Sequence, residues 1–178
     1  MASEKEMPRR GDKMTRKASA AAVHKRFIPS QADAKYDRSG RWGIRCGRSL
    51  GLKVKSREGF IRKIREGLDI KALEYFSHVI ELSDRELAQC ADISVRTLAR
   101  RKQEGKLQAD ESDRVARISM LFDEAVDLFD NDEKRAAYWF RTPKKALGGA
   151  SPIEYADTEP GAQEVRDLIG RIEHGVFA

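Results

Sequence analysis

Two short capped segments, only three residues apart, constrain the fold of the middle of this chain more than any other feature. Ser83 and Glu86 form the pattern of a capping box, in which a hydroxyl and a carboxylate each accept a free amide at the start of a helix. The helix that they open ends near Ala91, and Ser94 can cap a second helix three residues later. Two helices joined by so short a turn must cross steeply, so the pattern predicts a helix-turn-helix.

The residues of this motif also suit close packing of its two helices. Ala88 is small where the helices approach each other. Cys90 lies beside the packing face of the first helix and is expected to be a small core residue, with a redox site as the alternative. Asp92 occupies the turn position that Gly usually fills, and Asp tolerates the left-handed backbone region better than most residues. The positions expected to pack are apolar: Leu87, Ala91, Ile93 and Leu98.

The second helix of the motif is basic and predicts contact with DNA. A recognition helix meets base edges with its N-terminal residues, and Arg can pair bidentately with guanine. We therefore expect Arg96 and Arg100 to read bases, while the lysines and the other arginine hold phosphates. The alternative is a short helix pair with a solvated basic face. The candidate DNA-binding residues are Ser94, Val95, Arg96, Thr97, Arg100, Arg101, Lys102 and Lys106.

The rest of the chain predicts further helices and no sheet, because no alternating run of five or more residues occurs. The fold class is therefore all-α. The longest amphipathic stretch, 110–129, is expected to be a core helix, with a dimer seam as the alternative. Asn131 is expected to cap the helix that follows. The other expected helices are a short one between Ser56 and Gly67, one across 70–80, and a last one between Thr158 and Gly175.

The first part of the chain is strongly basic and poor in apolar residues. Residues 1–57 contain 16 Lys and Arg against 5 Asp and Glu, a net charge of +11, whereas the whole chain carries +6. Only seven of these residues are Leu, Ile, Val or Phe, about 12%. Residues 1–55 are therefore predicted to form a disordered tail that adds affinity for phosphates, and removal of residues 1–50 is expected to leave the core folded. A transit peptide is disfavoured by Glu4, Glu6 and Asp12.

Several classes of protein are excluded by what the chain lacks. Its longest apolar run is five residues, Ala136 to Phe140, and no signal-peptide core is present, so we expect a cytoplasmic chain that does not enter a membrane. The two cysteines, Cys46 and Cys90, have no metal-ligand spacing. The histidines His24, His78 and His174 belong to no nucleophile or paired-carboxylate pattern, so we expect no enzyme activity, metal or cofactor.

The last expected helix ends in an apolar segment. Val165, Leu168, Ile169 and Ile172 form its stripe, and Gly175 is a typical helix end. His174 near that end is a favourable charge placement. The final residues Val176, Phe177 and Ala178 require a groove, either on their own domain or on a partner.

Four motifs in this order resemble the Xre/MbcA/ParS-type antitoxins. They are Arg141-Thr-Pro, Ala146-Leu-Gly-Gly, Ser151-Pro-Ile-Glu-Tyr and Arg171-Ile-Glu-His-Gly-Val-Phe-Ala178. Upstream, Leu98-Ala-Arg-Arg-Lys and Gly105-Lys-Leu resemble the DNA-reading domain of the same family, so the resemblance covers roughly residues 57–178.

This resemblance implies a helix-turn-helix domain over 56–108 and a helical toxin-binding domain over 109–178. It implies a RES-domain toxin that destroys NAD as the protein partner, and repression of the shared operon through double-stranded operator DNA. A homodimer and a hetero-oligomer with toxin are expected. The alternative is a transcription regulator without a toxin partner. The residues expected to block the toxin are Arg171, Glu173, His174, Val176, Phe177 and Ala178.

Overall fold

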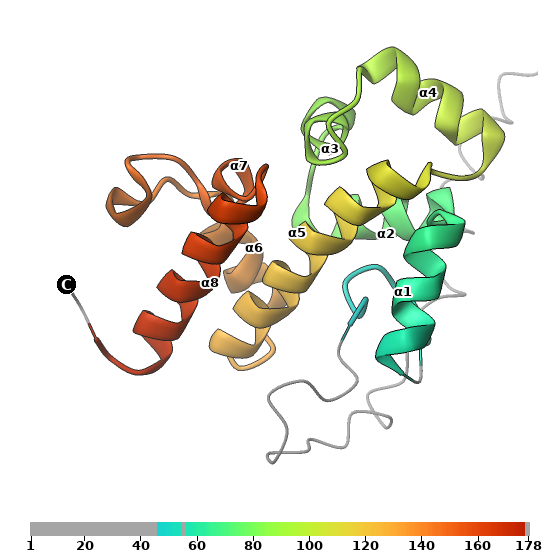
Figure 1. Cartoon of the computed structure of the whole chain (residues 1–178). Helices are drawn as coiled ribbons and strands as arrows, with labels where there is room; N and C mark the ends of the chain where they lie inside the picture. The colour runs from blue at the N-terminus through green and yellow to red at the C-terminus, as the bar shows by residue number, and fades with distance from the viewer. Residues whose placement is uncertain (1–45, 55, 177–178) are drawn as a thin grey trace, which may run out of the picture. The chain divides into compact units, whose positions relative to one another are not determined.

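The computed structural model describes residues 46–54 and 56–176, and all regular elements within them are helices (Figure 1). The all-α prediction is confirmed. Residues 1–45, together with the basic tail predicted there, lie outside the described residues. The elements are α1 (Arg57–Glu66), α2 (Ile70–Ile80), α3 (Asp84–Cys90), α4 (Val95–Glu104), α5 (Ala109–Leu128), α6 (Glu133–Arg141), the 3₁₀ turn η3 (Lys145–Leu147), α7 (Pro152–Tyr155) and α8 (Glu159–Glu173).

Local side-chain caps set most of the helix starts. The hydroxyls of Ser56, Ser94 and Thr158 accept backbone amides at the first turns of α1, α4 and α8, as predicted. The prediction for α6 was wrong by one residue. Asp132 caps it, because Asn131 has a φ of 68° and forms the turn that follows α5.

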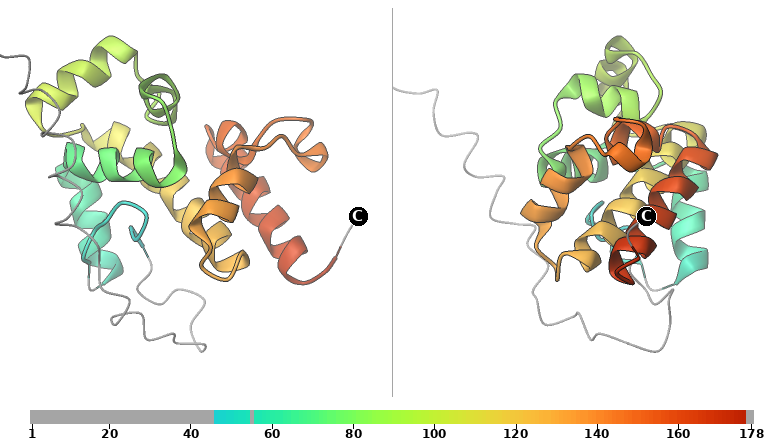
Figure 2. Two further views of the ribbon diagram at one scale, coloured as in Figure 1. Left: turned by 180° about the vertical axis from the view of Figure 1, so that it is seen from behind. Right: turned by 90° about the vertical axis from the view of Figure 1, so that its left-hand side faces the viewer.

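The helix α5 lies in the middle of the described fold, and helices from both halves of the chain pack against it (Figure 2). From Glu111 to Phe129 only Asp113 is exposed. Its neighbours are α1 and α3 from the first half of the chain and α6 and α8 from the second. The core-helix prediction for 110–129 is therefore confirmed, and the alternative of a dimer seam along this helix is wrong because no apolar face of it remains uncovered.

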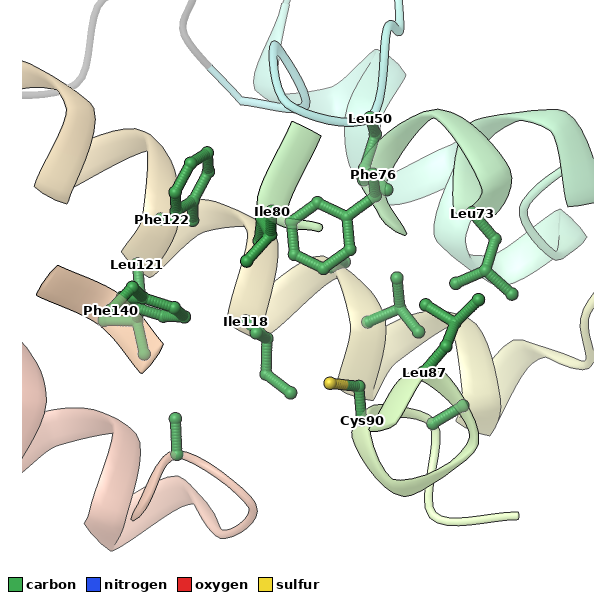
Figure 3. Packing of buried hydrophobic residues seen from close by; sticks show 14 of the residues in the cluster. Leu50, Leu73, Phe76, Ile80, Leu87, Cys90, Ile118, Leu121, Phe122 and Phe140 are labelled. Carbon is green, nitrogen blue, oxygen red and sulfur yellow. The ribbon is translucent and has the colours of Figure 1, made fainter. Parts of the chain in front are cut away.

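Three phenylalanine rings connect the two halves of the core (Figure 3). Phe76 of α2 meets Phe122 of α5 edge-on, with centroids 6.3 Å apart, and Phe122 meets Phe140 of α6 in the same way at 5.7 Å. All three side chains are fully buried. Edge-to-face pairs at these distances are favourable beyond the area that they bury. The core therefore continues without a break from the helix-turn-helix half into the C-terminal half.

The connections before α2 and before α5 lie side by side and close the first half. The amide of Leu107 donates to Leu68 O at 2.9 Å, and the amide of Ile70 donates to Gly105 O at 3.0 Å. Gly67 has a φ of +86°, and a Cβ there would lie 2.2 Å from Leu107 O. Only glycine permits this approach of two backbones.

Residues 46–54 pack on the core, although the sequence pattern assigned them to the tail. Leu50 is 1% exposed, and the Ser49 hydroxyl donates to Ser119 O of α5. Arg48 donates to Asn131 in the turn after α5. The boundary at residue 55 and the expectation that the core survives loss of residues 1–50 are therefore corrected. Few apolar residues suffice here because the polar contacts of the two preceding residues, Arg48 and Ser49, hold Leu50 against the core.

A buried carboxylate holds this segment against α5. The Ser49 amide donates to Asp123 Oδ1 at 3.0 Å, while Oδ2 has no hydrogen-bond partner. Burial raises the pKa of Asp123 to about 7, against the opposing effects of the Arg48 charge and the Ser49 hydrogen bonds. In the unfolded chain the same carboxyl titrates near about 3.9. Between these two pKa values the carboxyl of Asp123 is protonated in the native state and ionised in the unfolded chain. The free energy of unfolding therefore falls as the pH rises through this range.

Replacing Asp123 by Asn removes this titration. The free energy of unfolding of the wild type should fall relative to that of Asp123→Asn between about pH 4 and about pH 7, by roughly 2–4 kcal/mol in total, and the difference should then stay constant. Urea unfolding across this range measures it. Val126→Ala, a buried change on the same helix without a titrating group, should shift the curve by the same amount at every pH. A constant offset for Asp123→Asn as well would contradict the assignment.

Candidate functional site

The helix-turn-helix forms as predicted. Ser83 Oγ accepts the Glu86 amide, Glu86 Oε2 accepts the Ser83 amide at 2.7 Å, and α3 starts at this box. Asp92 has the positive φ expected of the turn, 51°. Leu87, Ala91 and Leu98 are buried, so α3 and α4 pack through the predicted positions. We call helices α1–α4, which include the helix-turn-helix of α3 and α4, the reader.

The outward face of α4 carries two arginines and a small apolar side chain. Arg96 and Arg100 are exposed and stand four residues apart, which places them on one face of the helix. Val95 is 51% exposed beside them. Ser94 is exposed at the cap, and its hydroxyl lies 2.9 Å from that of the half-buried Thr97. Lys106, just beyond the helix, is also exposed.

Arg101 does not share this face, contrary to the prediction. Its side chain turns inward and is only 8% exposed. Arg101 Nε lies 2.8 Å and 3.0 Å from the two carboxylate oxygens of Glu111 at the start of α5, and Nη1 lies 2.6 Å from Glu104. Arg101 is therefore not available to bind a DNA phosphate. It has a structural role, because its pair with Glu111 joins α4 to α5.

Hydrogen bonds keep both members of this ion pair, Arg101 and Glu111, in their charged forms. Burial by itself would raise the pKa of Glu111, but hydrogen bonds from Arg101 and from the Gln108 amide, with the charge of Arg101, lower it below its usual range. The same hydrogen bonds from Glu111 and Glu104 raise the pKa of Arg101. The bidentate contact thus holds a carboxylate and a guanidinium charged inside the fold.

Lys102 also has an internal partner. Its Nζ lies 2.7 Å and 2.8 Å from the two carboxylate oxygens of Asp84 at the start of α3. Because the lysine is partly exposed, the pair is open to solvent and to competition from a phosphate. Of the four cationic residues expected to contact DNA beyond Arg96, Arg100 and Lys106 are exposed. Arg100 Nε lies 3.6 Å from Glu104 of the same helix, in a pair that is open to solvent.

The C-terminal half comprises α6, η3, α7 and α8, and we call it the C-terminal module. Gly161 allows α8 to lie against the end of α7, since a Cβ there would be 1.9 Å from Tyr155 O. A contact that the sequence did not predict connects this module to the reader: Arg141 Nη2 of α6 donates to Glu86 Oε1 at 3.2 Å. Glu86 thereby caps α3 with one oxygen and binds the module with the other.

The end of α8 is an exposed terminus with a defined turn. Gly175 has a φ of 67°, its amide donates to Ile172 O, and the Val176 amide donates to Arg171 O at 2.9 Å. This pair of bonds is a Schellman motif, which turns the chain away from the helix axis. Glu173 and His174 are exposed, Arg171 is half-buried and Val176 is 58% exposed. Phe177 and Ala178, the other predicted toxin contacts, lie outside the described residues.

The described residues offer neither a cluster of metal ligands nor a membrane-spanning helix. No group of three or more His, Cys, Asp or Glu side chains in residues 46–54 and 56–176 is arranged to hold a metal ion. None of the helices described there has the length and apolar character to cross a membrane. Cys90 is buried as predicted, and burial raises the pKa of its thiol to about 12.

The fold defines a class of protein, a helix-turn-helix protein whose C-terminal half continues its core. Comparison with known families refines this class. Residues 59–119 match the description "Antitoxin Xre-like helix-turn-helix domain", and residues 124–175 match "Antitoxin Xre/MbcA/ParS C-terminal toxin-binding domain". Two proteins named Antitoxin Xre, from Yersinia enterocolitica and Photorhabdus laumondii, are each 37% identical to this chain over 132 residues. The matched part is 74% of this chain and 89% of each relative.

A third relative is more distant. The Prs ADP-ribosylating antitoxin of a Sphingobium species is 23% identical over 124 residues, covering 65% of this chain and 78% of its own. The chain belongs to the Xre family of type II antitoxins, as the resemblance in its motifs indicated.

The structural role of Arg101 has a direct test. Arg101→Met should lower the urea midpoint of unfolding, because it leaves the Glu111 carboxylate buried without its cation. Arg100→Met, one residue along on the exposed face, is the matched control and should leave the midpoint unchanged. The double variant Arg101→Met/Glu111→Leu should recover most of the loss, since it removes both charges together. An unchanged midpoint for Arg101→Met with weaker DNA binding would return Arg101 to the DNA contacts.

Proposed function

We propose that this antitoxin neutralises a RES-domain toxin that degrades NAD, and that it represses its own operon by binding operator DNA. The observation that carries the proposal is the exposed end of α8, which lies within the part of the chain that matches a toxin-binding domain. The reader, at the other end of the same core, offers a separate face with Arg96 and Arg100. The two activities therefore have different surfaces.

The DNA-binding half acts through the first turns of α4. Arg96 and Arg100 enter the major groove and pair with guanines, while Ser94, Val95 and Thr97 line the same turn. Lys106 binds a phosphate, and Lys102 does so when it exchanges Asp84 for the DNA backbone. A homodimer places two readers on half-sites about one helical turn apart. Its interface lies away from α5, because that helix is covered within one chain.

The toxin-binding half acts through the segment that follows the Schellman turn. The exposed Val176 is the first of three apolar residues, followed in sequence by Phe177 and Ala178. This apolar segment binds in the cleft in which the toxin binds NAD. Arg171, Glu173 and His174 make polar contacts at the rim of that cleft. A single aromatic side chain buried in such an interface contributes about 1.5–3 kcal/mol, which suits Phe177 to be an anchor.

The Sphingobium relative favours a second candidate for the chemistry of the toxin. Its name, Prs ADP-ribosylating antitoxin, refers to ADP-ribosylation. That reaction also takes its ADP-ribose from NAD, and it differs from NAD degradation in the acceptor, a protein instead of water. The same apolar end would cover an NAD cleft in both cases. Incubating the toxin with adenine-labelled NAD and a cell lysate that supplies acceptor proteins separates the two reactions, since only ADP-ribosylation leaves label on protein.

Arg96→Ala should weaken binding to the cognate operator by about 1–3 kcal/mol and relax the preference at one base position. Lys106→Ala should weaken operator and unrelated DNA alike and flatten the salt dependence, because it removes a phosphate contact only. Arg62→Ala, an exposed arginine on α1, is the control. Fluorescence anisotropy with operator and scrambled duplexes measures all three. Operator binding by Arg96→Ala that equals the wild type would remove this residue from the interface.

Removing residues 174–178 should abolish neutralisation while operator binding and helical content persist, because α8 ends at Glu173 and the core lies upstream. Cells that express the toxin with the truncated antitoxin should lose NAD as fast as cells with toxin alone. Glu164→Ala, an exposed change on the first half of α8, is the control and should neutralise fully. Full neutralisation by the truncated protein would place the inhibitory surface elsewhere, on the loop from Lys144 to Tyr155.

A further inference from the structure

A groove of about 1020 Å³ lies between the reader and the C-terminal module. One wall is α3 with the turn that follows it, and the other is formed by α6 and α7, as Figure 1 shows for the positions of these helices. Residues from both family matches line it, so neither domain forms the groove alone. Its lining includes neither Arg96 nor Arg100 and no residue beyond Thr158, so the groove is separate from the outward face of α4 and from the end of α8.

The wall made by α6 presents an aromatic ring between two cations. Lys134, Ala137, Tyr138 and Arg141 all line the groove, and their spacing is that of one helix face. Tyr138 has 76% of its surface exposed, although it stands beside an apolar recess. An exposed ring of this size is the type of side chain that anchors protein interfaces when a pocket receives it.

The floor of the groove is apolar and its rim is acidic. Cys90 is buried at the base, and Leu82, Ile93 and Ile153 are half-buried along the sides. An apolar floor of this kind suits a ring better than it suits a charged group. The acidic residues of the rim are Glu81, Glu86, Asp92, Glu154 and Asp157.

One charge on each wall is not used within the described part of the chain. Arg141 of α6 already pairs with Glu86 of α3 at 3.2 Å. Lys134 on the α6 wall and Glu81 on the opposite wall are both exposed, and neither makes an ion pair with any residue in 46–54 or 56–176. The groove thus offers a free cation on the side of the ring and a free carboxylate on the side of the recess.

A surface that combines a projecting ring with a recess, and a free cation with a free anion, is complementary to itself. In an isologous dimer both copies use the same patch, so each contact occurs twice. We propose that two copies of this chain join groove to groove. Tyr138 of each copy lies on the apolar floor of the other, and Lys134 of each copy pairs with Glu81 of the other. This inference rests on the homodimer of the proposed function and names its interface.

The charge and the position of the groove favour a second copy over DNA as its occupant. Five carboxylates against two cations on the rim repel phosphates. Ser94 caps α4 and also lines the groove, so these carboxylates lie beside the DNA-reading turn. The cations of a second copy neutralise part of this repulsion. Because the interface adjoins the reader, it also sets the spacing of two α4 helices on neighbouring half-sites.

A charge exchange between two different chains tests the contact. In sedimentation equilibrium the full-length wild type should be a dimer, and Glu81→Lys or Lys134→Glu should each raise the dissociation constant about tenfold or more, because each places like charges opposite each other twice. Mixing the two variants should restore the dimer, since in a dimer of one Glu81→Lys chain and one Lys134→Glu chain both contacts join opposite charges. With an affinity tag on one variant, the untagged variant should co-purify.

The controls change the same charges elsewhere. Glu74→Lys on α2 and Lys145→Glu on η3 are exposed, lie outside the groove and should leave the dissociation constant unchanged. Tyr138→Ala should dissociate the dimer, whereas Ile61→Ala on α1 should not. A monomeric wild type, an equal loss in the controls, or a mixture of Glu81→Lys and Lys134→Glu that gives no dimer would overturn the proposal.

Binding of DNA and of toxin separates this inference from the proposed function. Tyr138→Ala should bind an operator with two half-sites about tenfold more weakly or worse, bind a single half-site like the wild type, and still neutralise the toxin, because the end of α8 is unchanged. Loss of neutralisation by Tyr138→Ala with an intact dimer would make the groove a toxin surface and overturn the proposal. Full neutralisation by the chain without residues 174–178 counts against the proposed toxin site only, since the dimer is measured without toxin.

Discussion

Burial of α5 is the constraint on which the rest of this structure depends. A helix of 20 residues normally keeps one polar face in water, but here only Asp113 is exposed between Glu111 and Phe129. The polar groups on the covered faces therefore need internal partners. Ser112 accepts the Leu68 amide, Glu111 pairs with Arg101, and Asp123 accepts the Ser49 amide. Each of these contacts fastens a different upstream segment onto α5, so the burial of one helix organises the first half of the chain.

This constraint decides which charges remain for partners. A row of basic residues on and after α4 looks uniform in sequence, but Arg101 faces the covered helix and its charge is used within the fold. Lys102 is intermediate, because its pair with Asp84 is partly exposed and exposed pairs contribute little. Arg96 and Arg100 are left on the outer face. The exposed cationic surface of α4 is thus smaller than the number of basic residues in the segment indicates.

Features that depend on neighbours in sequence were predictable, and features that depend on distant segments were not. The caps at Ser56, Ser83, Ser94 and Thr158 were predictable because each hydroxyl bonds an amide within a few residues. The turn at Asp92 follows from a local backbone preference. The inward direction of Arg101, the packing of Leu50 and the pair of Glu86 with Arg141 all depend on segments that local patterns do not bring together. Of the candidate site, the exposure of Arg96 and Arg100 was therefore predictable from their spacing on α4, whereas the inward direction of Arg101 was not.

The position of α5 also determines how the two halves can act together. The family matches divide the chain between residues 119 and 124, which falls inside this continuous, buried helix and not in a linker. The edge-to-face contacts of Phe122 with Phe76 and Phe140 cross the same point. The exposed pair of Arg141 with Glu86 is too weak to hold the halves by itself, so the apolar core does so. A hinge at the boundary would have to break a helix and open the core. The reader and the end of α8 are therefore held at a set spacing, and the geometry of any complex with both DNA and toxin follows from the scaffold.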